Sequence, residues 1–202
     1  MMAAHPAAWG TRRALFLAGG MLLLAGATLG RHALESSMAS HMLVQMPAIF
    51  LSGALAAAAM AGAGHPAAGL RRLRQYDEHG LPGLLLISFL LAYWMIPKAI
   101  DHVLLAPGAE AAKFASLFAG GLIAKDCLAR ANRVIQLFFL GNIAWMMAIA
   151  GLLYQDNATR LCNFYLLDDQ VLAGQGLVLL SVALPVLWVW RQLRRHSGRP
   201  LA

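Results

Sequence analysis

The chain has 202 residues, of which 60% are hydrophobic and only 12% are charged, and its mean hydropathy is +0.63. Soluble domains contain roughly 45–50% apolar residues, so a water-soluble fold is excluded. The net charge of +7 does not indicate nucleic-acid binding, because the basic residues form short clusters between long apolar runs, as topology signals do. We therefore expect an all-α, polytopic transmembrane helix bundle that contacts membrane lipid and has no nucleic-acid partner.

Signature motifs of common enzymes are absent from the sequence. There is no phosphate-binding P-loop, no HExxH zinc site and no GxSxG nucleophile turn. The two cysteines, Cys127 and Cys162, are expected on opposite sides of the membrane and therefore unpaired. We expect a single membrane domain over residues 1–202 that is not an enzyme.

Apolar runs long enough to cross a bilayer as a helix, about 20 residues, predict six spans. Five are clear, and the fourth is weaker because Lys113 lies near its start and Lys125 and Asp126 near its end. Arg12 and Arg13 before the first run leave a cleaved signal peptide as the alternative to a first span. The expected spans cover residues 14–30, 38–62, 81–99, 111–128, 134–155 and 170–190.

The basic residues orient these spans, because cytoplasmic loops carry an excess of Lys and Arg. Six spans with both termini in the cytoplasm place twelve of the sixteen Lys and Arg residues inside, and without the fourth span the arginines of the C-terminal tail would lie outside. Lys113 falls on the outer side and is expected to extend its stem to the interface. The inner set is Arg12, Arg13, Arg71, Arg72, Arg74, Lys125, Arg130, Arg133, Arg191, Arg194, Arg195 and Arg199.

Polar residues gather at the outer end of the expected bundle, where they mark function because such groups are costly in lipid. At 100° per residue, one face of the second helix carries Glu35, Met38, His41, Met42, Gln45 and Met46. Thioether and imidazole ligands suit Cu(I), so this face predicts copper handling. The alternative is that the methionines pack the core and that His41 and Gln45 form interhelical hydrogen bonds. Pro47 predicts a kink directly after this face.

Two further polar groups lie at the outer ends of the third and sixth expected helices. Trp94-Met-Ile-Pro97 closes the third helix and is followed by Asp101 and His102. Asp168, Asp169 and Gln170 open the sixth helix. One of these two carboxylates can cap the helix and complement its dipole, which leaves the second without a structural task.

Three segments together resemble the CtaG family of caa3-type cytochrome c oxidase assembly factors. They are residues 40–46, 94–101 and 169–174, in the family's order and at matching helix ends, and the resemblance extends from about Arg12 to Trp190. It implies a bacterial inner-membrane protein that helps a haem-copper oxidase of the respiratory chain to mature by supporting copper delivery. The matching positions are His41, Met42, Trp94, Pro97, Asp101, Asp169 and Gln170.

The chain departs from the family pattern at two places that bear on a metal. Members typically carry a histidine four residues after the first one, where this chain has Gln45. They also tend to carry one in the helix after the WxxP segment, where this chain has Lys113 and Phe114. Many members have seven spans rather than six. Losing histidines predicts altered metal affinity or another role.

From this resemblance and the polar pattern we predict an oxidase assembly factor, a chaperone that binds cytochrome c oxidase subunits, in an oligomeric state that the sequence leaves open. Its Cu(I) ligands would be His41, Met42 and Met38, with His32 and His102 as accessory groups and Asp101, Asp169, Gln45 and Gln170 as supporting or partner-binding groups. One alternative is a small membrane cytochrome with haem between histidines such as His41 and His102. Another is a structural subunit of a respiratory complex.

Overall fold

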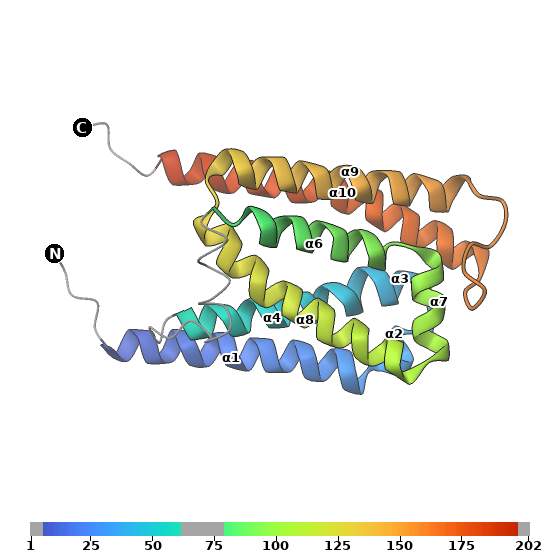
Figure 1. Cartoon of the computed structure of the whole chain (residues 1–202), viewed down its shortest axis with the longest axis horizontal. Helices are drawn as coiled ribbons and strands as arrows, with labels where there is room; N and C mark the ends of the chain where they lie inside the picture. Colours follow the sequence, from blue (N-terminus) through green and yellow to red (C-terminus); the bar gives the residue numbers. More distant parts are fainter. Residues whose placement is uncertain (1–5, 62–78, 198–202) are drawn as a thin grey trace.

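The computed structural model describes residues 6–61 and 79–197, and every regular element in these two ranges is a helix (Figure 1). This confirms the all-α prediction for the described part of the chain. The expected inner residues Arg71, Arg72, Arg74 and Arg199 lie outside it. The elements are α1 (Pro6–Leu29), α2 (Arg31–Leu34), α3 (Met38–Ser40), the π-helical turn η1 (His41–Gln45), α4 (Met46–Ala61), α6 (Leu81–Trp94), α7 (Pro97–Leu105), α8 (Pro107–Arg130), α9 (Arg133–Asp156) and α10 (Leu167–Ser197).

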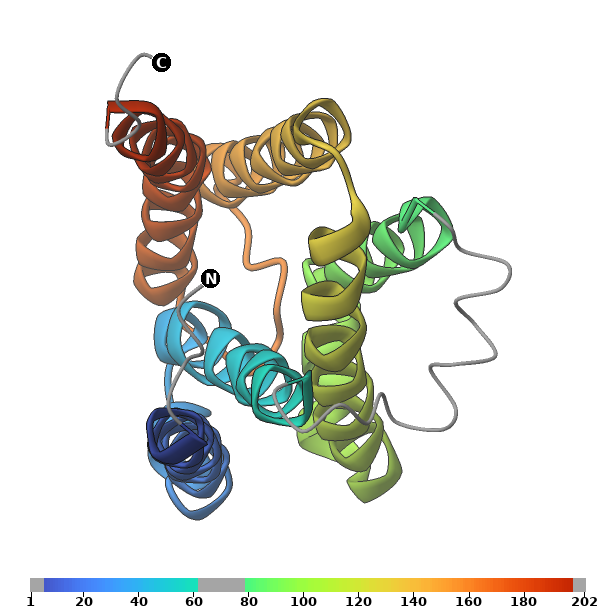
Figure 2. The same ribbon diagram turned by 90° about the vertical axis from the view of Figure 1, so that its left-hand side faces the viewer.

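The long helices run along one common axis, and the chain reverses direction at the two ends of the bundle (Figure 1). The start of α1 and the end of α10 lie at the same end. At the opposite end lie α2, α3, α7 and the loop of residues 157–166, and we call this the polar end. Viewed along the bundle, α4 lies between α1 and α8, while α9 pairs with α10 (Figure 2).

Four helical segments in the described residues are long and apolar enough to cross a membrane: Gly10–Leu29, Met38–Ala61, Arg133–Asp156 and Leu167–Arg194. The bent pair of α6 and α7 makes a fifth if it is counted as one span. α8 is not among them, since Glu110, Lys113, Lys125, Asp126 and Arg130 all lie within its 24 residues. Length and composition therefore support four or five spans, and the sixth stays a prediction.

The third expected span, residues 81–99, is not one continuous helix. α6 ends at Trp94 and α7 begins at Pro97, with a bend of 73° between them. Proline suits the first turn of a helix and favours an extended residue before it, and Ile96 has φ −80° and ψ 124°. The hydroxyl of Tyr154 in α9 donates to the carbonyl of Met95 at the break, which satisfies one backbone group there. α7 thus turns across the polar end.

The second expected span contains a π-helical turn where a proline kink was predicted. The amide of Met46 bonds to the carbonyl of His41, five residues back, and Pro47 follows immediately. A wider turn accommodates a residue that lacks an amide hydrogen, and such turns are frequent at functional sites. Along this turn His41, Met42 and Gln45 are all buried.

Glycines let α4 and α8 pack backbone to backbone. A side-chain carbon at Gly121 of α8 would collide with the carbonyl of Phe50 in α4, and one at Gly53 of α4 would collide with the carbonyl of Phe118. Small residues permit such close approach between helices in membranes. This contact fixes α8 against α4 and thereby sets the position of Lys113 relative to the π-helical turn.

Candidate functional site

A fully buried lysine organises the polar groups inside the polar end. Lys113 of α8 has 0% exposure, and its Nζ lies 2.7 Å from Glu35 Oε1, 2.9 Å from Gln45 Oε1 and 3.1 Å from His41 Nε2. An ammonium group has three hydrogen-bond donors, so these three acceptors use all of them. We call Glu35, His41, Gln45, Lys113 and Tyr165 the lysine cluster.

The π-helical turn places His41 and Gln45 side by side, four residues apart, facing α8. Glu35 lies between α2 and α3, just before the apolar segment Met38–Ala61. The amide of Gln45 donates to Glu35 Oε1 over 3.0 Å and to the carbonyl of Ala27 in α1 over 3.2 Å. The cluster therefore connects α1, the π-helical turn and α8, which are far apart in sequence.

Tyr165, from the loop before α10, completes the cluster. Its hydroxyl lies 2.8 Å from His41 Nδ1 and 3.1 Å from the backbone carbonyl of Glu35. Since a carbonyl only accepts, the hydroxyl donates to Glu35 and accepts from Nδ1–H of His41. The other ring nitrogen, Nε2, then accepts from the Lys113 ammonium, which is the pattern of a neutral imidazole.

Two ion pairs link the start of α8 to the segment before α3. Lys113 and Glu35 form the inner pair at 2.7 Å. Burial would raise the pKa of Glu35, but hydrogen bonds from Lys113 and Gln45 and the charge of the lysine outweigh burial and lower that pKa. Arg31 and Glu110 form a more exposed pair at 2.9 Å, and pairs of that kind contribute little stability.

Asp101 of α7 anchors the loop of residues 157–166 from the other side. Its Oδ2 accepts hydrogen bonds from the backbone amide and the side-chain amide of Asn163, at 2.9 and 3.0 Å. Its Oδ1 is buried without a protein partner. An open pocket of about 440 Å³ adjoins it, lined by Tyr93, Ile96, Lys98, Ala99, Asp101, His102, Leu105 and Asn163.

Gln170 ties the same loop to the first turn of α10. It is 1% exposed, accepts from the amide of Leu161 over 2.7 Å, and donates to the carbonyl of Tyr154 over 3.0 Å. Asp168 and Asp169 both lie in the first turn of α10, where their charge suits the helix dipole. The loop of residues 157–166 thus binds to all three segments on which the resemblance rests.

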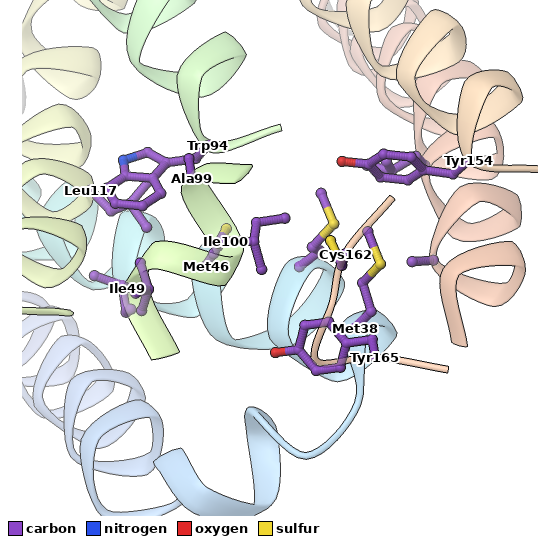
Figure 3. Close-up of a cluster of buried hydrophobic side chains, with 14 of the residues drawn as sticks. Met38, Met46, Ile49, Trp94, Ala99, Ile100, Leu117, Tyr154, Cys162 and Tyr165 are labelled. Atoms are coloured by element: carbon purple, nitrogen blue, oxygen red, sulfur yellow. The ribbon is translucent and has the colours of Figure 1, made fainter. Parts of the chain in front are cut away.

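The methionines of the predicted copper face pack in the apolar core. Met38 is 0% exposed and Met42 is 6% exposed, and both belong to the core cluster that also holds Cys162 and Tyr165. Figure 3 shows Met38 beside Cys162 and Tyr165. Cys127 and Cys162 are both buried and form no disulfide with each other, as predicted. The sulfur atoms of this face lie among apolar side chains, which favours the alternative that its methionines pack the core.

The remaining predicted metal groups lie elsewhere. His32 is exposed on α2, and His102 is exposed on α7 beside the pocket, so neither belongs to the buried lysine cluster. The prediction that Lys113 extends to the membrane interface is wrong. Its ammonium points into the bundle because Glu35 offers an opposite charge there. Tyr165 was missed altogether, since it lies in an irregular loop without a periodic pattern.

As they stand, these side chains do not fit a copper ion. The nitrogen lone pair of His41 is directed at a positively charged ammonium, and its other ring nitrogen is bonded to Tyr165. Among the described residues, no three His, Cys, Asp or Glu side chains are grouped so that they could hold a metal. A haem between His41 and His102 meets the same obstacle at His41. Copper binding stays a prediction that requires Lys113 to move away.

No family model matches the chain, and neither a curated protein nor a solved structure matches it.

Proposed function

We propose that this protein is an assembly factor for a haem-copper cytochrome c oxidase in the bacterial inner membrane, and that it acts by binding oxidase subunits rather than by catalysis. One observation carries the proposal: a single loop joins the three segments that resemble the CtaG family. Within it, Asn163 binds Asp101, Tyr165 binds His41, and Leu161 binds Gln170.

The buried polar contacts at this end support a functional role for it. Polar and charged side chains are expensive inside a membrane bundle and are retained mainly where they serve function. Lys113, His41, Gln45 and Gln170 are each at most 1% exposed, and all take part in hydrogen bonds. In contrast, the partner-facing groups are those at the surface of the same end, namely the pocket beside Asp101 and the partly exposed Asp169.

The proposed topology places the polar end on the outer side of the membrane, with α8 as the fourth span and both termini in the cytoplasm. Basic residues at the opposite end of the bundle support this orientation. They lie near the start of α1, the end of α8, the start of α9 and the end of α10: Arg12, Arg13, Lys125, Arg130, Arg133, Arg191 and Arg194.

Deletion of the gene tests this function directly. We expect oxidase activity in membranes to fall, together with the copper or haem content of the purified oxidase, and expression of the chain to restore both. Unchanged activity and unchanged cofactor content would contradict the proposal. Stable co-purification with a fully metallated oxidase, with no defect on deletion, would instead indicate a structural subunit.

Single substitutions then locate the contact with the oxidase. Asp101→Asn and Asp169→Asn should fail to restore oxidase activity in the deletion strain, while Asp168→Asn, an exposed carboxylate one residue away, should restore it. Immunoblots of the membrane fraction must show equal amounts of the three variants. If all three restore activity equally, the partner docks neither on Asp169 nor on the pocket beside Asp101.

A further inference from the structure

The lysine cluster has the architecture of a small cation site. Three acceptors of different chemistry, a carboxylate oxygen, an amide oxygen and an imidazole nitrogen, converge on one point within 2.7–3.1 Å. They come from the segment before α3 and from the π-helical turn, and α8 supplies no acceptor to the set. What α8 supplies is the cation itself, the Nζ of Lys113.

Two of the three acceptors, His41 and Gln45, are oriented by contacts that do not involve the lysine. Tyr165 fixes the ring of His41 through Nδ1, so that Nε2 faces the centre. Gln45 is oriented by donating its own amide hydrogens to Ala27 and Glu35, which turns its carbonyl oxygen toward the centre. Supporting contacts of this kind are what preorganise the ligands of a bound ion.

We infer that the lysine cluster is a cation site whose permanent occupant is the Lys113 ammonium ion, and that this occupant excludes a metal ion from His41. An ammonium at 3.1 Å from Nε2 uses the lone pair that a metal would need. It also places a positive charge where the metal charge would be, and the two would repel. The inference concerns what occupies the centre and does not depend on the partner proposed above.

Replacing the occupant should convert the cluster into a metal site. Lys113→His with Gln45→His would surround the centre with His41, two new imidazoles and the Glu35 carboxylate, a donor set suited to Zn(II) and copper ions. We would purify the protein from cells grown with copper or zinc and measure bound metal per chain after dialysis against a weak chelator. Lys125→His, an exposed position in the same helix, is the matched control.

The expected result is that the double variant retains near-stoichiometric metal, whereas the unmodified chain and Lys125→His retain none. Stoichiometric copper in the unmodified chain that is lost in His41→Ala would overturn the inference. So would a folded double variant that takes up neither metal.

A second measurement decides the matter if the double variant does not fold. Lys113→Ala leaves the three acceptors around an empty position, which ethylammonium chloride can refill with a primary ammonium ion. We expect ethylammonium to raise the Tm of Lys113→Ala in detergent well above its effect on the unmodified chain and on Lys125→Ala, while tetraethylammonium gives no such gain because it has no N–H donors. An equal response of all three proteins to ethylammonium would show that no cation site exists there.

Discussion

Removing the ammonium of Lys113 leaves the partly buried Glu35 carboxylate without its counter-ion, and the acceptor atoms of His41 and Gln45 without their donor. Breaking a buried ion pair by deleting one partner costs about 3–5 kcal/mol, because the remaining charge has neither water nor a counter-ion. We therefore expect Lys113→Met to lower the free energy of unfolding by about that amount, measured by denaturant titration in detergent. Lys125→Met, at an exposed position, should change it little.

A substitution of Glu35, the ion-pair partner of Lys113, shows which result would contradict this prediction. Glu35→Gln removes the unpaired charge, so the double variant Glu35→Gln with Lys113→Met should lose much less stability than the sum of the two single losses. Additive losses would mean that Lys113 and Glu35 do not interact in the folded protein.

The lowered pKa of Glu35 predicts that the folded protein loses stability in acid. Its pKa is lowered from the ordinary value of 4.5 when the chain is folded, because hydrogen bonds and the charge of Lys113 outweigh burial. A lowered folded pKa contributes stability that is present above pH 4.5 and is lost as the pH falls through the folded value. Thermal unfolding between pH 7 and pH 3 should show this loss, and Glu35→Gln should show a smaller one. An identical pH profile for both proteins would contradict the assignment.

Cys162 should be chemically inert over the ordinary pH range. Burial, and to a lesser degree the charge of Asp101, raises its pKa to about 12, and the thiol is only 1% exposed. The thiolate is the reactive form, so alkylation by iodoacetamide at pH 8 should be very slow. A cysteine introduced by Asp168→Cys in a Cys127→Ser background, at an exposed position near the same loop, should react readily. Equal modification of both cysteines would mean that the loop is open.

At the scale of elements, the contact between α4 and α8 determines whether Lys113 meets its acceptors. Glycine in a helix is about 1 kcal/mol less favourable than alanine, so Gly→Ala normally stabilises. At Gly121 the sign should reverse, because the added carbon collides with the Phe50 carbonyl. Gly108, in the first turn of the same helix, has nothing within 4 Å of the added carbon. We expect Gly121→Ala to lower the Tm and Gly108→Ala to leave it unchanged or raise it.

Long apolar runs and a 100° periodicity are local signals. They predict the interior of α6 and α10 and the buried face of the second helix. Pro97 predicts the end of the third helix, but the bend of α7 across the polar end could not be predicted, because a proline shows where a helix ends and not which direction the chain takes next. The bend depends on partners from other helices: Tyr154, which bonds to Met95, and Ser116, which accepts from the Trp94 ring over 3.1 Å. The π-helical turn escaped prediction similarly, because Pro47 signals a local irregularity but not its kind.

The candidate site was half predicted for a related reason. The 100° spacing places Glu35, His41 and Gln45 on one face, but the copper hypothesis rests on His41 with Met38 and Met42 of that face and on the family resemblance. The direction of Lys113 depends on whether an opposite charge lies deeper than the interface, which a single sequence does not reveal. The copper hypothesis therefore assigns a metal ion to a position beside His41, where the Lys113 ammonium supplies the positive charge.

At the scale of the whole molecule, four of the five charged residues that keep α8 out of the apolar segments are paired with an opposite charge. Glu110 and Lys113 pair with Arg31 and Glu35, while Arg130 and Asp126 pair with each other at 3.1 Å. Internal pairing lowers the cost of placing such residues in a membrane bundle. α8 is also held against α4, α6 and α7 along its length. A helix with these contacts fits a crossing in which most of the charged side chains are paired with an opposite charge.

The crossing of α8 can be decided by labelling from outside the cell. Both native cysteines are first replaced, as Cys127→Ser and Cys162→Ser. A single cysteine is then introduced at an exposed position, by Asp168→Cys at the polar end or by Lys125→Cys at the opposite end. If α8 crosses, a membrane-impermeant maleimide applied to spheroplasts should label Asp168→Cys at once and Lys125→Cys only after lysis. If α8 stays outside, α9 and α10 invert, so that the labelling pattern is reversed. The two arrangements therefore predict opposite results at both positions, and no intermediate pattern fits either of them.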